Sequence, residues 1–182
     1  MPRGLLIIDI QRDYFPGGAY PLVAPDAAAA VASGLLAAFR AAGEPVVHLQ
    51  HLWDEPDAAF LRPGTDGVLP HPLVEPADGE LVLTKESPNG FLETALEAEL
   101  RARGIDELVV AGMMSSMCVD ATARAALDLG FVVAVAHDAC AAPDLEFAGQ
   151  ALPGATVHAA FMAALGDAGA TVAPAASLAP GA

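Results

Sequence analysis

Six short apolar runs, most of them separated by helix-like segments, are the feature that most constrains the fold of this 182-residue chain. Most of the runs are continuous rather than alternating, which is typical of strands covered on both faces in a parallel sheet. Strands that alternate with helices predict βαβ units and a doubly wound α/β fold with three layers, α/β/α. The runs begin at Gly4, Glu44, Glu80, Asp106, Phe131 and Ala170.

The helix-like segments end at glycines, which supports their assignment. A glycine just past the last helical turn can adopt the positive φ that this position requires. The predicted helices end at Gly43, Gly104 and Gly130, and a fourth is expected over residues 154–169. Asp26 is expected to cap the first of them.

One gap between strands has no helix-like pattern. Residues 54–79 are rich in Pro, Gly and Asp. A loop of this length in a compact domain is usually functional, so we expect a lid or an interface segment here. The chain length predicts one domain. We expect that domain over residues 1–174, followed by a loose C-terminal tail over residues 175–182.

Composition excludes several classes of partner. The formal net charge is −15, with only eight Lys and Arg residues, which disfavours nucleic acid and anionic membranes. No apolar stretch reaches the roughly 20 residues that span a bilayer. Asp9 interrupts the short apolar run near the N-terminus, which is unlike a signal peptide. Two cysteines make no disulfide framework. We therefore expect a cytoplasmic protein with reduced thiols and a small-molecule partner.

Three residues with useful chemistry follow predicted strands. Asp9 interrupts the first run, Lys85 ends the third, and Cys118 comes five residues after Met113. In doubly wound sheets, ligands bind at the carboxyl ends of the strands. The topology therefore predicts that these three side chains meet at one edge.

Each of the three also has an ordinary structural interpretation. A free Cys is most often a small buried hydrophobe, and a Lys after an edge strand is most often a solvated charge. A carboxylate inside an apolar run is costly unless it is paired, so Asp9 could also serve the fold alone, through a stabilising hydrogen bond to a neighbouring loop. Their joint placement favours a nucleophilic site. We expect a helix N-terminus and Lys85 to lower the pKa of Cys118, because both stabilise a thiolate.

Three blocks of the sequence resemble the isochorismatase-like cysteine hydrolases, a superfamily that includes nicotinamidases and N-carbamoylsarcosine amidase. The blocks are LLIIDIQRDYF (residues 5–15), KESPNGF (85–91) and GMMSSMCVDATARAALDLGF with HDAC (112–131 and 137–140). The resemblance implies a six-stranded parallel sheet of order 3-2-1-4-5-6. It also implies a catalytic triad of Asp9, Lys85 and Cys118.

The same resemblance implies a cis peptide bond between Met113 and Met114. A non-proline cis bond costs about 2.5–4 kcal/mol, so it is expected where it serves a site. Here it would direct the backbone N–H of Met114, together with that of Cys118, toward a developing oxyanion.

The histidines after the second strand depart from the metal site of nicotinamidases. Those enzymes use an Asp-x-His pair and a second His, and the Asp-x-His pattern is absent here. His48 and His51 are three apart, so they face opposite sides of a strand. We therefore predict that neither they nor His71 bind a metal. This departure also makes nicotinamide an unexpected substrate.

The walls of the substrate pocket are predicted from residues that closely follow Asp9 and Lys85 and from residues at the end of the second apolar run. Alternative interpretations remain for all of them, because each could simply pack in the core. We expect Asp13, Glu86 and Asp120 to be solvated or capping carboxylates, and Cys140 to be a packing residue. The predicted substrate-binding residues are Phe15, His51, Trp53 and Phe91.

The sequence predicts a cofactor-free hydrolase that cleaves a C–N bond of a small amide or ureido compound through a thioester. Family resemblance also implies a homo-oligomer, either a dimer or a tetramer. Two alternatives stay open. One is a catalytically silent binding or scaffold protein of the same fold. The other is a flavodoxin-like nucleotide binder, which the absence of a G-x-G-x-x-G motif after the first strand disfavours.

Overall fold

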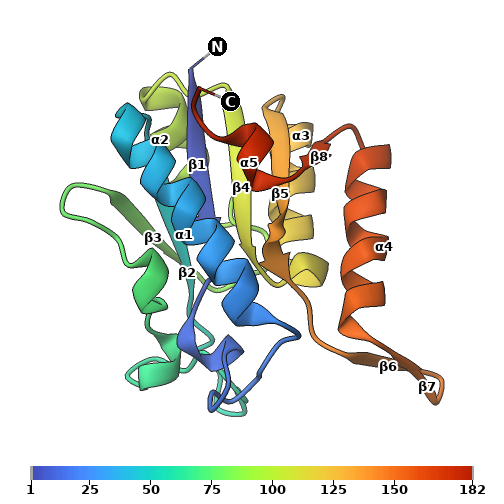
Figure 1. Cartoon of the computed structure of the whole chain (residues 1–182). Coiled ribbons are helices and arrows are strands. Elements are labelled where there is room, and N and C mark those ends of the chain that lie inside the picture. The colour runs from blue at the N-terminus through green and yellow to red at the C-terminus, as the bar shows by residue number, and fades with distance from the viewer. Residues whose placement is uncertain (1, 182) are drawn as a thin grey trace.

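The computed structural model describes residues 2–181, which form a six-stranded parallel sheet between two layers of helices (Figure 1). The strand order is β3-β2-β1-β4-β5-β8, and all five pairings are parallel. This confirms the predicted sheet and its order, with β8 as the sixth strand. The strands are β1 (Arg3–Ile8), β2 (Val46–His51), β3 (Leu81–Lys85), β4 (Glu107–Met113), β5 (Val132–Ala141) and β8 (Thr171–Ala173).

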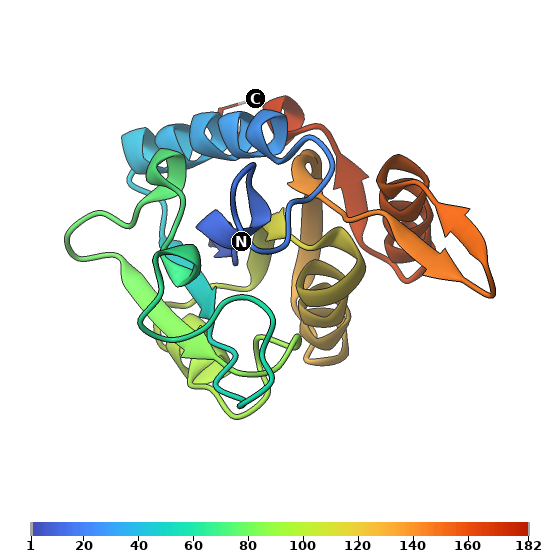
Figure 2. The same ribbon diagram turned by 90° about the horizontal axis from the view of Figure 1, so that it is seen from below.

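Helices cover both faces of the sheet (Figure 2). One face carries α1 (Pro25–Ala42) and α5 (Ala175–Leu178). The other carries α2 (Leu96–Ala102), α3 (Asp120–Asp128) and α4 (Gly154–Asp167). The first helix ends at Gly43 in the left-handed conformation, with φ of 67°, as predicted.

Two helix boundaries differ from the sequence-based prediction. Helix α1 begins at Pro25, so Ala24 takes the N-cap position and Asp26 lies within the first turn. Proline suits the first helical position because its missing N–H has no partner there anyway. Helix α2 is short, because residues 89–95 form turns before it.

The apolar character of the strands follows from burial on both faces. In β1, Leu5 and Ile7 pack toward α1, whereas Leu6 and Ile8 pack toward α2 and α3. Successive side chains of a strand point to opposite faces, so a central strand needs an apolar residue at every position. This explains the continuous apolar runs of the sequence.

An antiparallel hairpin between β5 and α4 was not predicted from the sequence. It consists of β6 (Leu145–Phe147) and β7 (Gln150–Leu152), joined by a two-residue turn with positive φ at Ala148 and Gly149. Such a turn is usually signalled by Asn-Gly or Asp-Gly. The sequence signal was therefore weak. The hairpin extends away from the sheet (Figures 1 and 2).

The C-terminal segment is not a loose tail. The Ala175 N–H donates to Asp138 Oδ1 at 2.8 Å, which fixes the start of α5. Arg3 Nη1 donates to the Leu178 carbonyl at 3.2 Å, and Leu178 packs against the core. Small residues at Ala175 and Ala179 allow this close packing on β5 and α1. The expected tail is thus wrong for residues 175–181.

The long loop after β2 lies across the carboxyl ends of the strands, where Figure 2 looks onto the molecule. It contains two short 3₁₀ turns, Asp66–Val68 and Pro72–Val74. Backbone hydrogen bonds attach it to the exit of β1: Arg12 N–H to Leu69 O at 3.0 Å and His71 N–H to Ile10 O at 2.8 Å. The loop therefore forms part of the edge where a site is expected.

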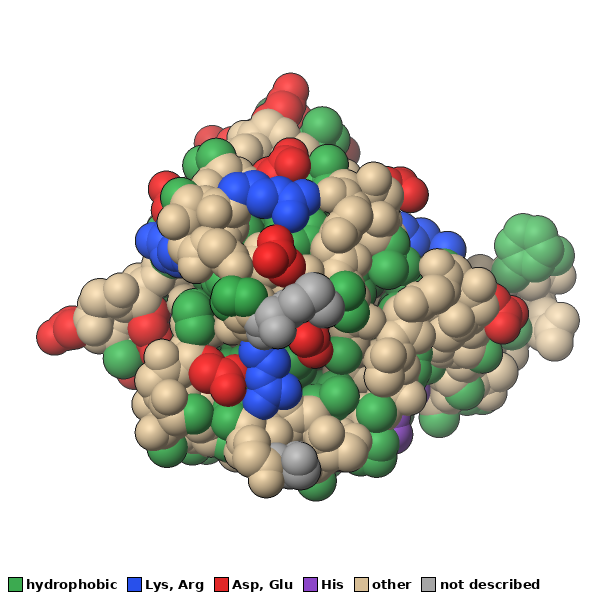
Figure 3. All heavy atoms as spheres, turned by 90° about the horizontal axis from the view of Figure 1, so that it is seen from above, with side chains coloured by type: hydrophobic (Ala, Val, Ile, Leu, Met, Phe, Trp, Pro, Cys, Tyr) green, Lys and Arg blue, Asp and Glu red, His purple; other side chains and the backbone are tan. Residues whose placement is uncertain are grey.

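The opposite edge, at the amino ends of the strands, carries basic side chains interspersed with acidic ones (Figure 3). Two ion pairs of this kind are Arg3 with Glu44 at 2.7 Å and Arg101 with Asp106 at 3.8 Å. Across the described residues of this face, the basic side chains form no continuous surface of the kind that binds nucleic acid. Within residues 2–181, none of the helices is long and apolar enough to cross a membrane.

Candidate active site

Asp9 lies immediately after β1 and is completely buried. Its backbone is in the left-handed region, with φ of 49°, which turns the chain sharply as it leaves the sheet. Aspartate tolerates this conformation better than most residues, although it is uncommon outside glycine. Its carboxylate faces Lys85, and the Nζ–Oδ2 distance is 2.7 Å with both side chains fully buried. A buried carboxylate of this kind requires such a partner.

Lys85, the last residue of β3, is surrounded by three acceptors. Besides the Asp9 carboxylate, they are His51 Nδ1 at 2.9 Å and the Ser87 carbonyl at 3.0 Å. Two of these contacts are hydrogen bonds, and the contact with Asp9 is an ion pair. Lys85 is therefore fully engaged, and it is not the solvated charge that its position alone would suggest.

Cys118 lies in a π-helical turn, Ser115–Val119, between β4 and α3. The peptide bond between Met113 and Met114 is cis, as the family resemblance implied. Just before it, β4 runs so close to β1 that a Cβ at Gly112 would collide with the Ile8 carbonyl. The thiol is buried, and its sulfur, a carboxylate oxygen of Asp9 and a ring nitrogen of His51 all lie within 4.8 Å of one another.

The protonation state of Cys118 differs from the sequence-based expectation. Burial, followed by the negative charge of Asp9, raises the pKa of the Cys118 thiol well above its usual value. Lys85 acts in the opposite direction but does not overcome them. The expected lowering is wrong because the thiol is buried beside a carboxylate. The resting group is a neutral thiol, which needs a base before it can attack.

The Asp9 carboxylate is suited to be that base. Among residues 2–181, neither of its oxygens has a hydrogen bond of regular geometry. The contact with Lys85 is close enough for an ion pair, but it lacks the alignment of a hydrogen bond. The carboxylate therefore keeps lone pairs that can accept a proton from a neighbouring S–H or O–H group.

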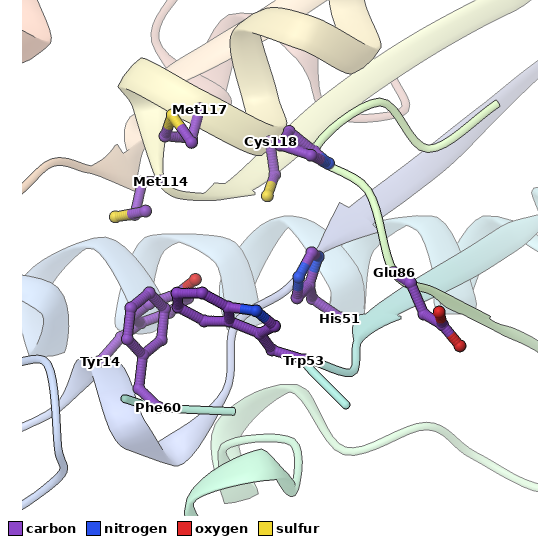
Figure 4. A pocket seen from close by; sticks show the side chains of 9 residues that line it. Tyr14, His51, Trp53, Phe60, Glu86, Met114, Met117 and Cys118 are labelled. Atoms are coloured by element: carbon purple, nitrogen blue, oxygen red, sulfur yellow. The ribbon is translucent and has the colours of Figure 1, made fainter. Parts of the chain in front are cut away.

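A cavity of about 260 Å³ opens in front of the thiol (Figure 4). Three aromatic rings lie on one side of it, and the Cys118 thiol faces them with two methionines beside it. Loops from four strand ends contribute to its walls. The lining residues are Tyr14, His51, Trp53, Phe60, Glu86, Pro88, Met114, Met117 and Cys118.

The structure brings two of the four predicted substrate-binding residues to this cavity, His51 and Trp53. Phe15 lies elsewhere and stacks on His71, with 3.9 Å between ring centroids. Phe91 packs against Phe131 in the core on the other face of the sheet. Tyr14 takes the place expected for Phe15, because neighbouring residues direct their side chains apart.

Residues that sequence reasoning missed build the aromatic wall. Phe60 comes from the long loop, meets Trp53 edge-on at 5.1 Å and stacks on Tyr20 at 4.6 Å. The loop is held by Asp13, which is buried and accepts hydrogen bonds from Leu61 N–H at 2.7 Å and Ala19 N–H at 3.0 Å. Asp13 is thus a structural carboxylate and not a solvated one. No periodic pattern in the loop indicated these contacts.

Gln11 is a second residue that the sequence did not single out. Its side chain is buried and pairs with the backbone of His51 in both directions: Nε2 donates to the His51 carbonyl at 2.9 Å, and Oε1 accepts from its N–H at 2.9 Å. Nε2 also donates to Val68 O at 2.6 Å. Gln11 therefore fixes the end of β2 beside Asp9 and attaches the long loop to it.

The three histidines considered for a metal site lie in separate environments. His48 contacts Glu80 at 2.8 Å, and His71 stacks on Phe15, so neither faces His51. In the part of the chain that the structure describes, Asp9, His51 and Cys118 form one cluster of potential ligands. However, the Lys85 ammonium already contacts His51 Nδ1 and Asp9 Oδ2. A metal ion there would have to displace a buried cation.

Fold and site define a class: a doubly wound α/β protein with a buried Asp–Lys pair and a thiol at the carboxyl edge of its sheet. Comparison with known families agrees with this. The isochorismatase domain matches residues 3–176. The chain is 47% identical over 172 residues to YddQ, an uncharacterised isochorismatase family protein of Bacillus subtilis, covering 94% of this chain and 96% of that protein. The chain therefore belongs to the isochorismatase family, a family of hydrolases.

Two further relatives have named activities. Streptothricin hydrolase of Streptomyces noursei is 41% identical over 170 residues, covering 91% of this chain and 60% of that enzyme. Maleamate amidohydrolase of Pseudomonas putida is 38% identical over 149 residues, covering 74% of this chain and 70% of that enzyme.

Solved structures show the same fold. The crystal structure of an isochorismatase family protein from Oleispira antarctica has a TM-score of 0.93 and 49% identity, covering 97% of this chain and 95% of that one. N-carbamoylsarcosine amidase of Thermoplasma acidophilum has a TM-score of 0.77 and 28% identity, covering 96% of this chain and 97% of that one.

Proposed function

We propose that this protein is a cysteine-dependent amidohydrolase that cleaves a C–N bond of a small amide or ureido compound through a thioester. The observation that carries the proposal is a buried thiol beside a buried Asp9–Lys85 ion pair at the floor of a cavity. The names of three relatives, a streptothricin hydrolase, a maleamate amidohydrolase and an N-carbamoylsarcosine amidase, support this class of reaction.

The first half-reaction forms the thioester. Asp9 takes the proton from Cys118 as the sulfur attacks the carbonyl carbon, and the carbonyl π electrons move onto oxygen. The backbone N–H groups of Met114 and Cys118 stabilise that oxyanion. The Met114 N–H is suited to this role, because it makes no hydrogen bond to any other group within residues 2–181. The C–N bond then breaks, and protonated Asp9 gives its proton to the leaving nitrogen.

The second half-reaction returns the enzyme to its resting state. Asp9, again a carboxylate, takes a proton from water while the water oxygen attacks the thioester. The C–S bond breaks, the acid leaves, and the proton on Asp9 returns to the sulfur. Lys85 holds the Asp9 carboxylate in place in both steps, because the two opposite charges lie 2.7 Å apart.

His51 serves as a hydrogen-bond donor in this scheme and not as the base. Lys85 has only donors, so His51 Nδ1 must accept the hydrogen bond between them. Burial, followed by the charge of Lys85, lowers the pKa of His51, so the ring is neutral. Its one proton then lies on Nε2, and the ring borders the cavity. A nitrogen that carries this proton cannot accept another from Cys118.

Replacing His51 by Leu should lower kcat/KM about three- to tenfold, the usual effect of one lost hydrogen bond. The shape of the pH profile of kcat/KM should not change, because a neutral donor does not titrate in the working range. His71→Leu is the matched control, since His71 lies outside the cavity. Loss of an ionisation from the profile of the His51 variant would instead identify His51 as the base.

Chelators should leave the hydrolase activity unchanged within experimental error. The buried Lys85 ammonium already occupies the Asp9 and His51 atoms that a metal would need. The measurement is the rate of ammonia release after dialysis against EDTA, with and without added Zn²⁺. Activity that EDTA removes and Zn²⁺ restores would contradict the metal-free mechanism.

The experiment that tests the proposed function combines turnover with detection of the intermediate. A panel of small amides and ureido acids is assayed for ammonia release, and acid-quenched samples are analysed by mass spectrometry. We expect an added acyl mass on the peptide that contains Cys118. A silent binding protein would release no ammonia from any compound and would carry no acyl group.

A further inference from the structure

We propose that the cavity selects amides whose acyl group is uncharged and apolar, and that it discriminates against amides bearing a carboxylate. This inference rests on the amidohydrolase function proposed above and concerns the part of the substrate that does not react. It is drawn from the size, the walls and the charges of the cavity. Neither membership of the family nor the names of the relatives determine whether the acyl group of the substrate is charged.

The size of the cavity limits the substrate. Its volume of about 260 Å³ lies just below the range of about 300–1,000 Å³ that is usual for ligand pockets. A carboxamide with an acyl group of about six carbon atoms fits this space. Larger compounds would have to extend beyond the mouth.

The walls of the cavity favour apolar groups. Tyr14, Trp53 and Phe60 supply aromatic surface on one side. Pro88, Met114 and Met117 supply aliphatic and thioether surface elsewhere. Transfer of apolar surface from water to such walls favours binding, because the hydrophobic effect grows with the apolar area buried. An alkyl or phenyl group on the carbonyl carbon therefore gains affinity at nearly every contact.

The charges around the cavity exclude anions. Of the described residues that line it, none is Lys or Arg. The nearby Lys85 is fully buried and already has three acceptors. The buried Asp9 carboxylate next to the thiol would repel a second carboxylate, and the exposed Glu86, which also lines the cavity, adds negative charge. Taking a carboxylate out of water without a partner is strongly unfavourable.

The net charge of the whole chain also disfavours anionic substrates. A net charge of −15 creates a negative field that lowers the local concentration of anionic substrates. Maleamate, which the name of one relative gives as its substrate, is a carboxylate-bearing amide. We expect this chain to hydrolyse maleamate poorly, because its cavity offers no cation to bind the acid group.

The test uses two amides of nearly equal shape. In 4-methylpentanamide an isopropyl group occupies the place of the carboxylate in succinamate, and both have eight non-hydrogen atoms, a count of about the size that the cavity volume admits. We expect kcat/KM for 4-methylpentanamide to exceed that for succinamate by about 10²-fold or more, because the anion loses its hydration without gaining a partner. Benzamide serves as a second neutral substrate.

A variant can supply the positive charge that the cavity walls lack. Met117 lines the cavity and is 46% exposed, so a longer polar side chain fits there. Met117→Lys should shift the ratio of the two kcat/KM values toward succinamate about tenfold, or 1.4 kcal/mol. Met117→Gln is the matched neutral control. Glu146→Gln, on the exposed hairpin, makes the same change in net charge far from the walls.

The outcomes separate the two proposals. Succinamate hydrolysed as fast as 4-methylpentanamide would overturn the inference and leave the amidohydrolase intact. Binding is measured independently, by the protection that each amide gives Cys118 against alkylation. If 4-methylpentanamide is neither hydrolysed nor protective, the inference is wrong. If no amide of any charge acylates Cys118, the proposed function fails. Equal shifts in the Met117→Lys and Met117→Gln variants would also overturn the charge argument.

Discussion

Replacing Cys118 by Ala should abolish hydrolysis and leave the fold intact. In the proposed mechanism the sulfur is the atom that bonds to the substrate, and loss of the nucleophile of a catalytic triad costs about 10⁶-fold in kcat. The substitution removes one atom from a turn next to a cavity, so it creates little new empty volume. Ammonia release measures the activity, and thermal unfolding measures the fold.

Cys140 provides the matched control for this prediction. It is also buried, it lies in β5, and its Sγ donates to the Ala136 carbonyl at 3.4 Å. It does not line the cavity in front of Cys118. Cys140→Ala should therefore keep full activity with a small loss of stability. Turnover that survives in Cys118→Ala, or that is lost equally in both variants, would rule out Cys118 as the nucleophile.

The fold could be predicted from the sequence because strands buried on both faces appear as continuous apolar runs. Each central strand needs apolar residues at every position, as Leu5 to Ile8 show, and glycines such as Gly43 mark where helices end. The sequence of the hairpin β6–β7 shows no comparable pattern, since Ala-Gly is an unusual pair of residues for its turn. The expected tail failed because small residues such as Ala175 pack well without forming a visible apolar pattern.

The triad positions could be predicted because topology alone brings strand ends together. The structure places Asp9, Lys85 and Cys118 at one edge, as expected, although their catalytic roles stay predictions. The aromatic wall could not be predicted in the same way, since Phe60 reaches the site through a long loop held by single hydrogen bonds. The direction of the thiol pKa also depends on burial, which the sequence did not reveal.

The expected homo-oligomer likewise stays a prediction. The flavodoxin-like alternative loses its basis, because the β1 exit holds Asp9 and Gln11 in buried contacts instead of a phosphate-binding glycine loop. The silent binding protein is the alternative that matters most. It shares every structural feature of the site, so measurements of turnover and of proton transfer must distinguish it from the enzyme.

Asp9→Asn provides that measurement, because it should change hydrolysis and thiol acidity in opposite directions. Asn keeps the shape of the side chain but cannot take the proton. A general base contributes about 10²–10⁴-fold in rate, and Asp9 serves both half-reactions. We therefore expect kcat to fall at least that far. No thioester should accumulate, since both its formation and its hydrolysis are slowed.

The thiol should at the same time become more acidic. In the parent, the negative charge of Asp9 raises the pKa of Cys118, and Lys85 lowers it. Removing the carboxylate deletes the first effect and leaves the Lys85 cation without its ion-pair partner, so both changes favour the thiolate. The pKa of Cys118 should fall, and its alkylation at neutral pH should become faster. Burial raises the pKa of Cys140 to about 12, so Cys140 does not obscure the titration.

The measurement follows thiolate absorbance against pH, together with the rate of alkylation by iodoacetamide. Asp13→Asn is the matched control, because it makes the same chemical change at a buried carboxylate that binds backbone N–H groups. It should reduce stability without lowering the pKa of Cys118. If the protein is the proposed hydrolase, the Asp9→Asn variant loses turnover while its Cys118 thiol becomes more reactive. If the variant folds and turns over within a few-fold of the parent, or if its thiol becomes less acidic, Asp9 is not the base.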